Sequence, residues 1–306
     1  MVRIAVVGLG KIARDQHLPA IAGSAAFELA ATVDPAGDGV VGAAHFASIE
    51  ALLESGLAFD AAALCTPPQV RRNLAEALLA RGVHVLLEKP PGVTLGEVAV
   101  LERAAEAAGA SLFAAWHSRF AHGVAAARDW LAGRQITAVR VVWREDVRVW
   151  HPGQRWIWQP GGLGVFDPGI NALSILTHIL PQPVYLTEAI LDVPANCAAP
   201  IAADLRLRTA GGAPVHMDLD FLQTGPQSWD IVVETDGGPL SLAKGGAELT
   251  LPDGALRGKD REYALLYAHF AGLIAARQSD VDMGPLRIVA DAFLCGRHVV
   301  VEPFIE

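Results

Sequence analysis

The stretch "VVGLGKIA" (6–13) decides the fold of the first part of the chain. It places Gly8, Gly10 and Ala13 in a Gly-x-Gly-x-x-Ala pattern, between an apolar strand-like run and a helical segment. In this pattern the first glycine permits a tight turn and the second lets the backbone approach a pyrophosphate, while the third small residue lets helix and strand pack closely. The stretch therefore predicts a dinucleotide-binding βαβ unit rather than an ordinary glycine turn.

The sequence on either side of this turn repeats the same alternation of strand and helix. A strong helical pattern at 95–109 ends at Gly109 and separates two apolar runs. Runs that are apolar at nearly every position are typical of parallel strands covered on both faces. The expected strands are 3–8, 28–34, 61–66, 83–88 and 111–116. These elements predict a doubly wound parallel sheet.

Asp34 lies at the end of the second expected strand, roughly 20 residues after the glycine motif, where a carboxylate binds the ribose 2′-hydroxyl of a dinucleotide. A carboxylate repels a 2′-phosphate, and the residues that follow, "DPAGDG", contain no Arg or Lys. The sequence thus favours NAD over NADP, with NADP left open.

After about residue 120 the sequence changes to alternating strands separated by turns such as "AGGA" and "DGGP". This pattern predicts a mostly antiparallel, open sheet in an α+β domain. We expect strands at 138–150, 203–210, 215–222, 229–236, 239–243 and 247–252, and helices in "HGVAAARDWLAGR", "YALLYAHFAGLIAARQ" and "PLRIVADAFLCGRHV". The expected domains are 1–118, which binds NAD(P), and 119–306, which binds substrate and forms oligomers. Because open parallel sheets bind ligands beyond their strand C-termini, we expect a cleft between these domains.

Composition narrows the class of protein. A formal net charge of −9 argues against nucleic acid as a partner, since phosphate binding requires clustered Lys and Arg. No apolar run is long enough to span a bilayer, and the first strand-like run lacks the basic start of a signal peptide. Three widely separated cysteines and histidines without ligand spacing predict neither disulfides nor a metal site. A cytoplasmic protein is expected.

Several longer strings carry a resemblance to a known family. "GLGKIA", "CTPPQV" and "EKPPG" resemble the glucose–fructose oxidoreductase/inositol dehydrogenase family over the whole chain. "GKIARDQHLPAI", "WHSR", "WREDVRVWHPGQRWIWQPGGLGVFDPGINALSI" and "GRHVVVEPFIE" are closest to its bacterial aldose 1-dehydrogenases, which act on galactose or L-arabinose. This resemblance implies oxidation of a cyclic sugar at C1 to its lactone, and homodimers or homotetramers formed through the C-terminal sheet.

The resemblance also implies roles for residues near the cofactor. Lys89, in the "EKP" motif, is expected near nicotinamide and substrate, and Lys89–Pro90 is a candidate cis peptide. A lysine at a strand C-terminus accepts a proton more readily when burial or a cationic nicotinamide lowers its pKa. The alternative is a surface lysine paired with Glu88. The full set expected to bind cofactor is Gly8, Gly10, Lys11, Ile12, Ala13, Asp34, Thr66, Pro67, Glu88 and Lys89.

The stretch "GGLGVFDPGIN" (161–171) is the expected contribution of the second domain. Taken alone, Asp167 before Pro168 is typical of a helix N-cap. Asn171 lies four residues further on, which places both side chains on one helix face. Relatives place histidine where this chain has Asn171, and an amide cannot titrate. Asp167, Asn171 and Lys89 are therefore the candidate catalytic residues, and Asp167 and Lys89 both remain candidates for accepting the proton.

Other residues are expected to hold the sugar. Glu145 falls in the apolar row of the strand 138–150, where it either binds sugar hydroxyls or forms a structural ion pair. Trp150 and His151 belong to a tryptophan-rich stretch suited to sugar C–H faces and hydroxyls, although some of its tryptophans are expected in the core. His117 and Trp229 complete the expected substrate-binding set, and His17 is expected to be structural or to lie beside the cofactor.

These observations predict an NAD(P)-dependent aldose 1-dehydrogenase that oxidises the C1 hydroxyl of D-galactose, L-arabinose or both. Two alternatives remain: a dehydrogenase of the same family for another sugar or inositol, and a catalytically silent dinucleotide-binding sensor. The sequence does not rank the aldoses and does not fix the oligomer.

Overall fold

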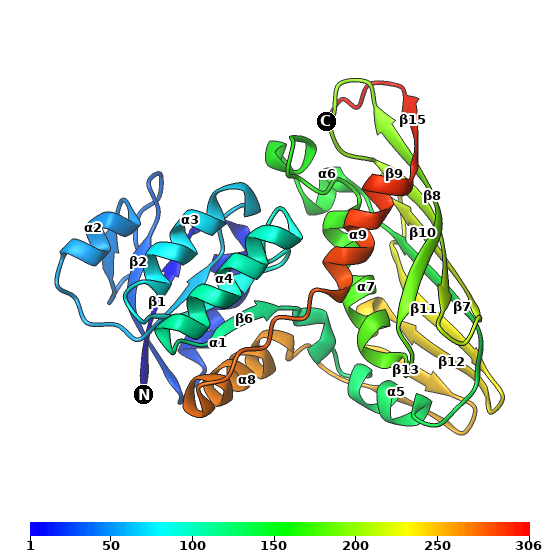
Figure 1. Ribbon diagram of the computed structural model, residues 1–306, viewed down its shortest axis with the longest axis horizontal. Coiled ribbons are helices and arrows are strands. Elements are labelled where there is room, and N and C mark those ends of the chain that lie inside the picture. The colour runs from blue at the N-terminus through cyan, green and yellow to red at the C-terminus, as the bar shows by residue number, and fades with distance from the viewer. The chain divides into compact units, whose positions relative to one another are not determined.

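The computed structural model describes residues 1–306 and contains two compact units. Unit 1 comprises Met1–Trp116 and Tyr263–Asp282, and unit 2 comprises His117–Glu262 and Met283–Glu306. The sequence predicts a boundary after residue 118, whereas unit 1 runs to Trp116 and also includes 263–282. The reason is helix α8 (Glu262–Ala276), which is labelled in Figure 1. Its Tyr267 and Phe270 rings pack against Phe27 within unit 1.

Unit 1 is built on a six-stranded parallel sheet in the order β3-β2-β1-β4-β5-β6. Its order places the first strand in the middle, next to β2 and β4. The strands are β1 (Val2–Val7), β2 (Phe27–Val33), β3 (Ala44–Phe46), β4 (Ala61–Leu64), β5 (His84–Glu88) and β6 (Leu112–Ala115). Every expected strand of this half is present, and β3 is an additional short edge strand. The sheet is therefore the doubly wound parallel sheet that the sequence predicts.

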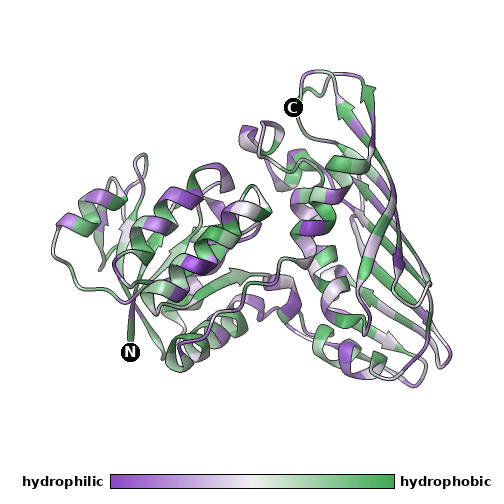
Figure 2. Cartoon of the chain, viewed as in Figure 1, coloured by the Kyte–Doolittle hydropathy of each residue, from purple (hydrophilic) through white to green (hydrophobic).

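Helices lie on both faces of this sheet. A π-helical segment η1 (Ala13–His17) continues as α1 (Leu18–Ala22), and α2 (Ile49–Glu54), α3 (Pro68–Leu79) and α4 (Leu95–Ala108) follow. The apolar core beneath α2, α3 and α4 includes Leu52, Leu78 and Leu101. The strands are coloured largely as apolar in Figure 2, whereas α3 and α4 show both colours, as helices with one buried face should.

Helix α4 begins and ends where its sequence predicts. The hydroxyl of Thr94 accepts a hydrogen bond from the backbone N–H of Glu97 at 3.2 Å, which caps the first turn. Gly109 follows the last turn with φ of 62°, a left-handed conformation that glycine adopts without strain. The helix therefore connects β5 to β6 with local signals at both ends.

Unit 2 contains a nine-stranded sheet in the order β14-β13-β12-β11-β7-β10-β9-β8-β15. Most neighbours are antiparallel, as expected, but β10 pairs with β7 and β15 with β8 in parallel, so the sheet is mixed. The strands are β7 (Ile136–Arg144), β8 (Val184–Pro194), β9 (Ala202–Thr209), β10 (Pro214–Asp220), β11 (Ser228–Thr235), β12 (Gly238–Ala243), β13 (Glu248–Leu251), β14 (Gly254–Arg257) and β15 (Arg297–Val301).

The helices of unit 2 pack on one side of this sheet (Figure 1). They are α5 (Val124–Leu131), α7 (Phe166–Ile179) and α9 (Gly284–Cys295), with the short α6 (Val147–Trp150), η2 (His117–Phe120) and η3 (Arg155–Trp158) in the connections. Alternate residues of β7, namely Val139, Val141 and Trp143, are buried, whereas Arg140 between them is exposed. The opposite face of the sheet is therefore the polar one.

Two expectations for the second half are wrong in detail. The strand expected over 138–150 ends at Arg144, because the Asp146 side chain accepts a hydrogen bond from the N–H of Arg148 and starts α6. The helix expected to continue to residue 299 ends at Cys295, and the following residues form β15. Strand β8 was not expected at all. No helix of the structure is long and apolar enough to cross a membrane.

Candidate functional site

The glycine turn of unit 1 has the geometry that its sequence predicts. Gly8 has φ of +88°, and a Cβ there would lie 3.0 Å from the backbone nitrogen of Thr66. A Cβ on Gly10 would meet no protein atom within 4 Å, so protein packing does not explain this glycine. The hydroxyl of Thr66 is buried and has no hydrogen-bond partner in the protein. An open backbone and an unpaired hydroxyl beside it fit a bound dinucleotide.

Asp34 closes this turn through its carboxylate. Its two oxygens accept hydrogen bonds from the backbone N–H groups of Leu9, at 2.7 Å, and Ala36, at 2.9 Å. Burial alone would raise the pKa of Asp34, but the hydrogen bonds from Leu9, Ala36 and Gly37 outweigh it and lower that pKa. The carboxylate is thus held ionised at the end of β2, where the sequence predicts contact with a ribose.

Arg14 is a residue that the sequence analysis missed. Its guanidinium donates hydrogen bonds to the carbonyl oxygens of Leu9, at 3.0 Å, and Asp38, at 3.2 Å. It thereby comes within 3.5 Å of the position where a Cβ on Gly37 would lie, and Asp34 comes within 3.6 Å of the same position. The segment after Asp34 contains no cation, but the fold brings one to it from η1. Arg14 lies one helical turn after Gly10. This spacing is the only indication in the sequence that Arg14 lies near the glycine turn.

Lys89 follows β5 and is joined to Pro90 by a cis peptide bond, as expected. Its backbone N–H donates to the carboxylate of Glu88 at 2.8 Å. The buried guanidinium of Arg71 donates to the carbonyl oxygens of Thr66, Glu88 and Pro90. This segment of backbone is therefore held from both sides by buried polar groups.

Glu88 is buried and forms hydrogen bonds to other protein groups. Its Oε1 accepts a hydrogen bond from the hydroxyl of Tyr263 at 2.7 Å and lies 3.0 Å from Nε2 of His17. Nδ1 of His17 lies 2.8 Å from the hydroxyl of Tyr267. His17 is fully buried in this network, which supports its expected structural role.

The charge state of this network follows from its contacts. Burial by itself lowers the pKa of His17, but the interactions with Cys65, Tyr267 and Glu88 raise it well above its usual value. Burial raises the pKa of Tyr267 to about 12, so this hydroxyl is neutral at pH 7. Glu88 is then the acidic partner of a protonated His17 inside the core. Burying either charge alone would cost free energy, and their pairing offsets that cost.

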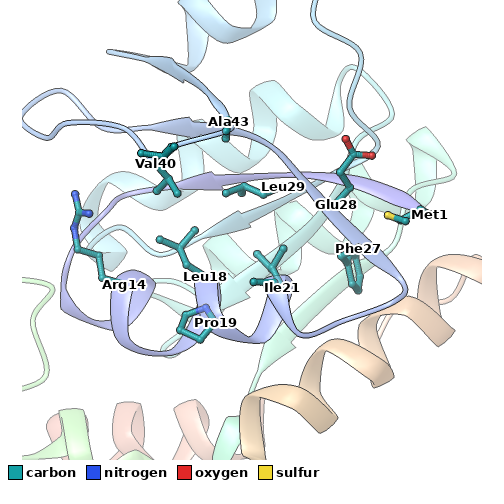
Figure 3. A pocket seen from close by; sticks show the side chains of 13 residues that line it. Met1, Arg14, Leu18, Pro19, Ile21, Phe27, Glu28, Leu29, Val40 and Ala43 are labelled. Carbon is teal, nitrogen blue, oxygen red and sulfur yellow. The ribbon is translucent and has the colours of Figure 1, made fainter.

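The remaining predicted cofactor residues lie around the same turn. Lys11 is exposed and pairs with Asp15, Ile12 and Ala13 lie at the start of the helical segment, and Pro67 precedes α3. A pocket of about 480 Å³ between α1, β2 and residues 40–43 has Arg14 at its rim (Figure 3). Apart from Arg14 its lining is mostly apolar and includes none of the predicted site residues.

In unit 2 three predicted residues meet in one cluster. Nε2 of His151 lies 3.3 Å from Oε1 of Glu145, and Nδ1 lies 3.6 Å from Oδ2 of Asp167. Glu145 directly follows β7, His151 follows α6, and Asp167 is in the first turn of α7. Both carboxylates are buried, with 4% and 2% of their surface exposed. An imidazole between two buried carboxylates provides the pairing that their burial requires.

Two tryptophans border this cluster. Nε1 of Trp229 donates a hydrogen bond to Oε2 of Glu145 at 2.9 Å, and the ring of Trp150 meets that of Trp229 edge-on at 5.0 Å. Trp150 is 41% exposed, whereas the Trp158 ring packs on Phe221 and Phe304. An exposed aromatic face beside buried hydrogen-bonding groups is chemically suited to a polyhydroxylated ring.

Asp167 is not the helix N-cap that its sequence indicates. Helix α7 begins at Phe166, and the capping position is Val165. Asp167 instead lies within the first turn, buried, with its carboxylate turned to His151. Asn171, one turn later, is partly exposed. Asp167, whose sequence context is typical of a helix cap, therefore belongs to the cluster with Glu145 and His151.

The glycines before Asp167 are explained by the protein's own backbone. A Cβ on Gly162 would lie 2.3 Å from the carbonyl oxygen of Trp156, and one on Gly164 would lie 2.2 Å from that of Pro200. No side chain fits at these separations. These glycines thus allow the backbone to lie close to residues 156–157 and 200. This contact fixes the position at which α7 begins.

His117, the remaining predicted residue, lies at the start of η2 and pairs with a different carboxylate. Its Nδ1 is 2.7 Å from Oε2 of Glu262. Both residues belong to unit 2, next to the points where the chain leaves it. The structure therefore places His117 outside the Glu145–His151–Asp167 cluster.

Comparison with known proteins gives the class. Residues 2–115 match the model of an oxidoreductase family with an NAD-binding Rossmann fold. The chain is 47% identical to a galactose 1-dehydrogenase from Pseudomonas fluorescens, over all of this chain and 99% of that protein. The chain therefore belongs to this oxidoreductase family, the glucose–fructose oxidoreductase/inositol dehydrogenase family that its sequence resembles.

Solved structures agree with this assignment. A crystal structure of a D-galactose-1-dehydrogenase from Rhizobium etli is 55% identical, with a TM-score of 0.95 over 99% of this chain and 98% of that one. A 3-ketoreductase from Actinomadura kijaniata in complex with NADP and TDP-benzene is 17% identical, with a TM-score of 0.84 over 98% of this chain and 99% of that one. The second likeness establishes the shared fold alone.

Proposed function

We propose that this chain is an aldose 1-dehydrogenase, which oxidises the C1 hydroxyl of a pyranose to a lactone and reduces a nicotinamide dinucleotide. The observation that carries the proposal is the buried Glu145–His151–Asp167 cluster bordered by Trp229 and Trp150. Such a cluster supplies charged hydrogen-bonding groups and an aromatic face to a sugar. The identity to two galactose 1-dehydrogenases over their full length supports the same substrate class.

D-Galactose is the proposed substrate, together with L-arabinose, because the two pyranoses share hydroxyl configurations from C2 to C4. Glu145, His151, Trp150, Trp229 and His117 are proposed to bind the sugar ring. Asn171 can orient a hydroxyl but cannot take its proton. We also expect the chains to assemble as dimers or tetramers through the polar face of the nine-stranded sheet.

The residues of unit 1 are proposed to hold a nicotinamide dinucleotide, which would accept the hydride. Because Gly8 and Gly10 have no side chains, the pyrophosphate can lie close to the backbone. The Asp34 carboxylate accepts a hydrogen bond from the ribose 2′-hydroxyl. NAD is the proposed cofactor, because ionised Asp34 repels a 2′-phosphate. Arg14 lies next to Asp34 and offers a partner for that phosphate, so NADP is proposed as a weaker second cofactor.

The chemical step removes a hydride from C1 and a proton from its hydroxyl. Lys89 and Asp167 are the two proposed acceptors for the proton. General-base catalysis contributes about 100- to 10,000-fold to such a step. Holding C1–H in line with the hydride acceptor is the larger contribution that the protein makes.

A kinetic series tests this proposal. Purified protein is mixed with NAD or NADP and a panel of aldoses and inositol, and kcat/KM is measured from the absorbance of reduced nicotinamide. We expect the highest value for D-galactose or L-arabinose with NAD. A higher value for inositol would make the chain a dehydrogenase of another substrate class, and tight NAD binding without any turnover would make it a sensor.

Lys89→Ala examines the unit 1 acceptor in the same assay. It is expected to lower kcat at least 100-fold while NAD affinity, measured by calorimetry, stays nearly unchanged. Full turnover in this variant would remove Lys89 from the chemistry.

A further inference from the structure

His151 has surroundings that a simple sugar-binding histidine would not need. Its imidazole has a buried carboxylate on each side, Glu145 at 3.3 Å from Nε2 and Asp167 at 3.6 Å from Nδ1. The Phe221 ring lies 5.5 Å away and the amide oxygen of Gln154 3.4 Å from Nδ1. The two nitrogens of one ring thus connect two acids on different elements.

His151 places a titratable group beside Asp167, which the residue at position 171 does not. Asn171 lies one helical turn after Asp167 and cannot carry a proton. His151 reaches the same carboxylate from outside the helix, through the segment that follows α6. The titratable partner that helix α7 does not provide is therefore supplied by the 147–151 segment.

The backbone around His151 holds the ring in this place. The N–H of His151 donates to the carbonyl oxygen of Val147 at 2.8 Å, and the N–H of Glu145 donates to that of Asp220 at 2.9 Å. Trp229 holds the second oxygen of Glu145, which leaves Oε1 facing the imidazole. Three fixed elements therefore set the geometry of the cluster, β7, α6 and α7.

We propose that Asp167, His151 and Glu145 form a proton relay, in which Asp167 takes the proton of the C1 hydroxyl and His151 passes it towards Glu145. This relay rests on the proposed aldose oxidation. The relay requires the tautomer of His151 that carries a proton on Nε2, facing Glu145, and a lone pair on Nδ1, facing Asp167.

The atoms balance as follows. The C1–H bond breaks with its electron pair leaving to the nicotinamide, the O–H bond breaks, and the C1=O bond forms. The hydroxyl proton goes to Oδ2 of Asp167 and then to Nδ1 of His151, while the Nε2 proton moves to Oε1 of Glu145 and from there to water. At 3.6 Å the distance between Oδ2 of Asp167 and Nδ1 of His151 is longer than a hydrogen bond, so this transfer requires closure by about 0.5 Å.

Chemical rescue distinguishes proton transfer from sugar binding. His151→Gly is expected to lower kcat about 100-fold or more, and added imidazole is expected to restore kcat in proportion to its neutral form. His151→Asn keeps a hydrogen-bonding side chain but cannot relay, so its kcat stays low. If His151→Asn or unrescued His151→Gly turns over at the wild-type rate, or if imidazole restores nothing, the relay is overturned.

His216 provides a matched control. It also pairs with a carboxylate, with Nε2 2.7 Å from Oδ2 of Asp204, and it lies on β10 outside the cluster. His216→Gly is expected to keep the wild-type kcat and to show no response to imidazole. A wild-type protein inactive on every aldose would be a failure of the proposed function, whereas an active wild type with an active His151→Gly would be a failure of the relay alone.

A measurement without turnover tests the coupling itself. The ring nitrogens of His151 are followed by NMR across pH in the wild type and in Asp167→Asn and Glu145→Gln. Glu145 and Asp167 both face the His151 ring, so each variant is expected to shift its titration midpoint while the His216 signals stay in place. An unshifted His151 midpoint in both variants would contradict the relay.

Discussion

Asp34 and Arg14 show how two neighbouring charges set the expected choice of cofactor. Asp34 is ionised because three backbone N–H groups lower its pKa against the effect of burial. Arg14 approaches the same turn from η1 and binds the carbonyl oxygens of Leu9 and Asp38. A carboxylate at this position would accept a hydrogen bond from a ribose hydroxyl, whereas the guanidinium is the group that a 2′-phosphate would bind.

Arg14→Leu is therefore expected to weaken binding of 2′-phosphorylated nucleotides selectively. A hydrogen bond to a charged group contributes about 1.5–3 kcal/mol, which corresponds to a loss of roughly tenfold or more in affinity. Calorimetry with adenosine 2′,5′-bisphosphate and with 5′-AMP measures the difference without turnover. Equal losses for the two nucleotides would show that Arg14 holds only the loop.

His17 is the other residue whose charge has a consequence for the whole unit. Removing one partner of a buried ion pair costs about 3–5 kcal/mol, so His17→Gln is expected to destabilise the protein by that amount. The control is His216→Gln, whose pair with Asp204 is partly exposed and contributes about 0–1 kcal/mol.

The raised pKa of His17 also predicts the direction of a pH effect. A group whose pKa is higher in the folded state adds stability that is complete below its unfolded pKa, about 6.5, and is lost as pH rises through the folded pKa. Urea unfolding between pH 6 and 9 should show this decline in the wild type and not in His17→Gln. Parallel curves for the two proteins would contradict a protonated His17 in the core.

At the scale of elements, residues 302–306 support the segment that carries Trp150 and His151. The Phe304 ring packs on Trp158 at 5.1 Å and lies 5.0 Å from the guanidinium of Arg148. Its backbone exchanges two hydrogen bonds with the Asn196 side chain, at 2.8 and 2.9 Å. Trp158 in turn packs on Phe221, which touches His151, so an aromatic row joins the tail to the cluster.

Phe304→Ala is expected to loosen this segment. Loss of the ring removes packing from Trp158, so trypsin should cut after the exposed Arg155 several times faster than in the wild type. Mass spectrometry of the fragments identifies the cut. Tyr185→Ala, which removes an exposed ring from β8, should leave the rate unchanged, and an unchanged rate in Phe304→Ala as well would mean that the tail does not hold the segment.

Local signals in the sequence predicted the elements better than their partners. The turn at Gly8, the end of α4 at Gly109 and the burial of Glu145 each depend on spacing over a few residues, and all are present. Gly162 and Gly164 show the limit of such signals, because their neighbours are backbone atoms of residues 156–157 and 200. The sequence does not predict these neighbours, because they lie elsewhere along the chain.

At the scale of the molecule, the contacts that sequence could not predict join distant segments. Helix α8 returns to unit 1, where Tyr263 bonds Glu88 from 175 positions further along the chain. Arg14 meets the loop after Asp34, and His151 meets Asp167 on another element. Each of these contacts depends on how strands and helices pack, so the spacing of residues along the chain does not predict it. The whole-chain resemblance supplied the class of protein, and the structure supplied these pairings.

The central claim is that hydride leaves from C1 of an aldose. D-Galactose carrying deuterium at C1 tests it directly, with mass spectrometry of the reduced nicotinamide and a comparison of rates with unlabelled sugar. The account predicts that one deuterium appears in the reduced nicotinamide, and that kcat/KM falls if hydride transfer limits the rate. Reduced nicotinamide that forms without deuterium, while the label stays in the sugar product, would contradict oxidation at C1.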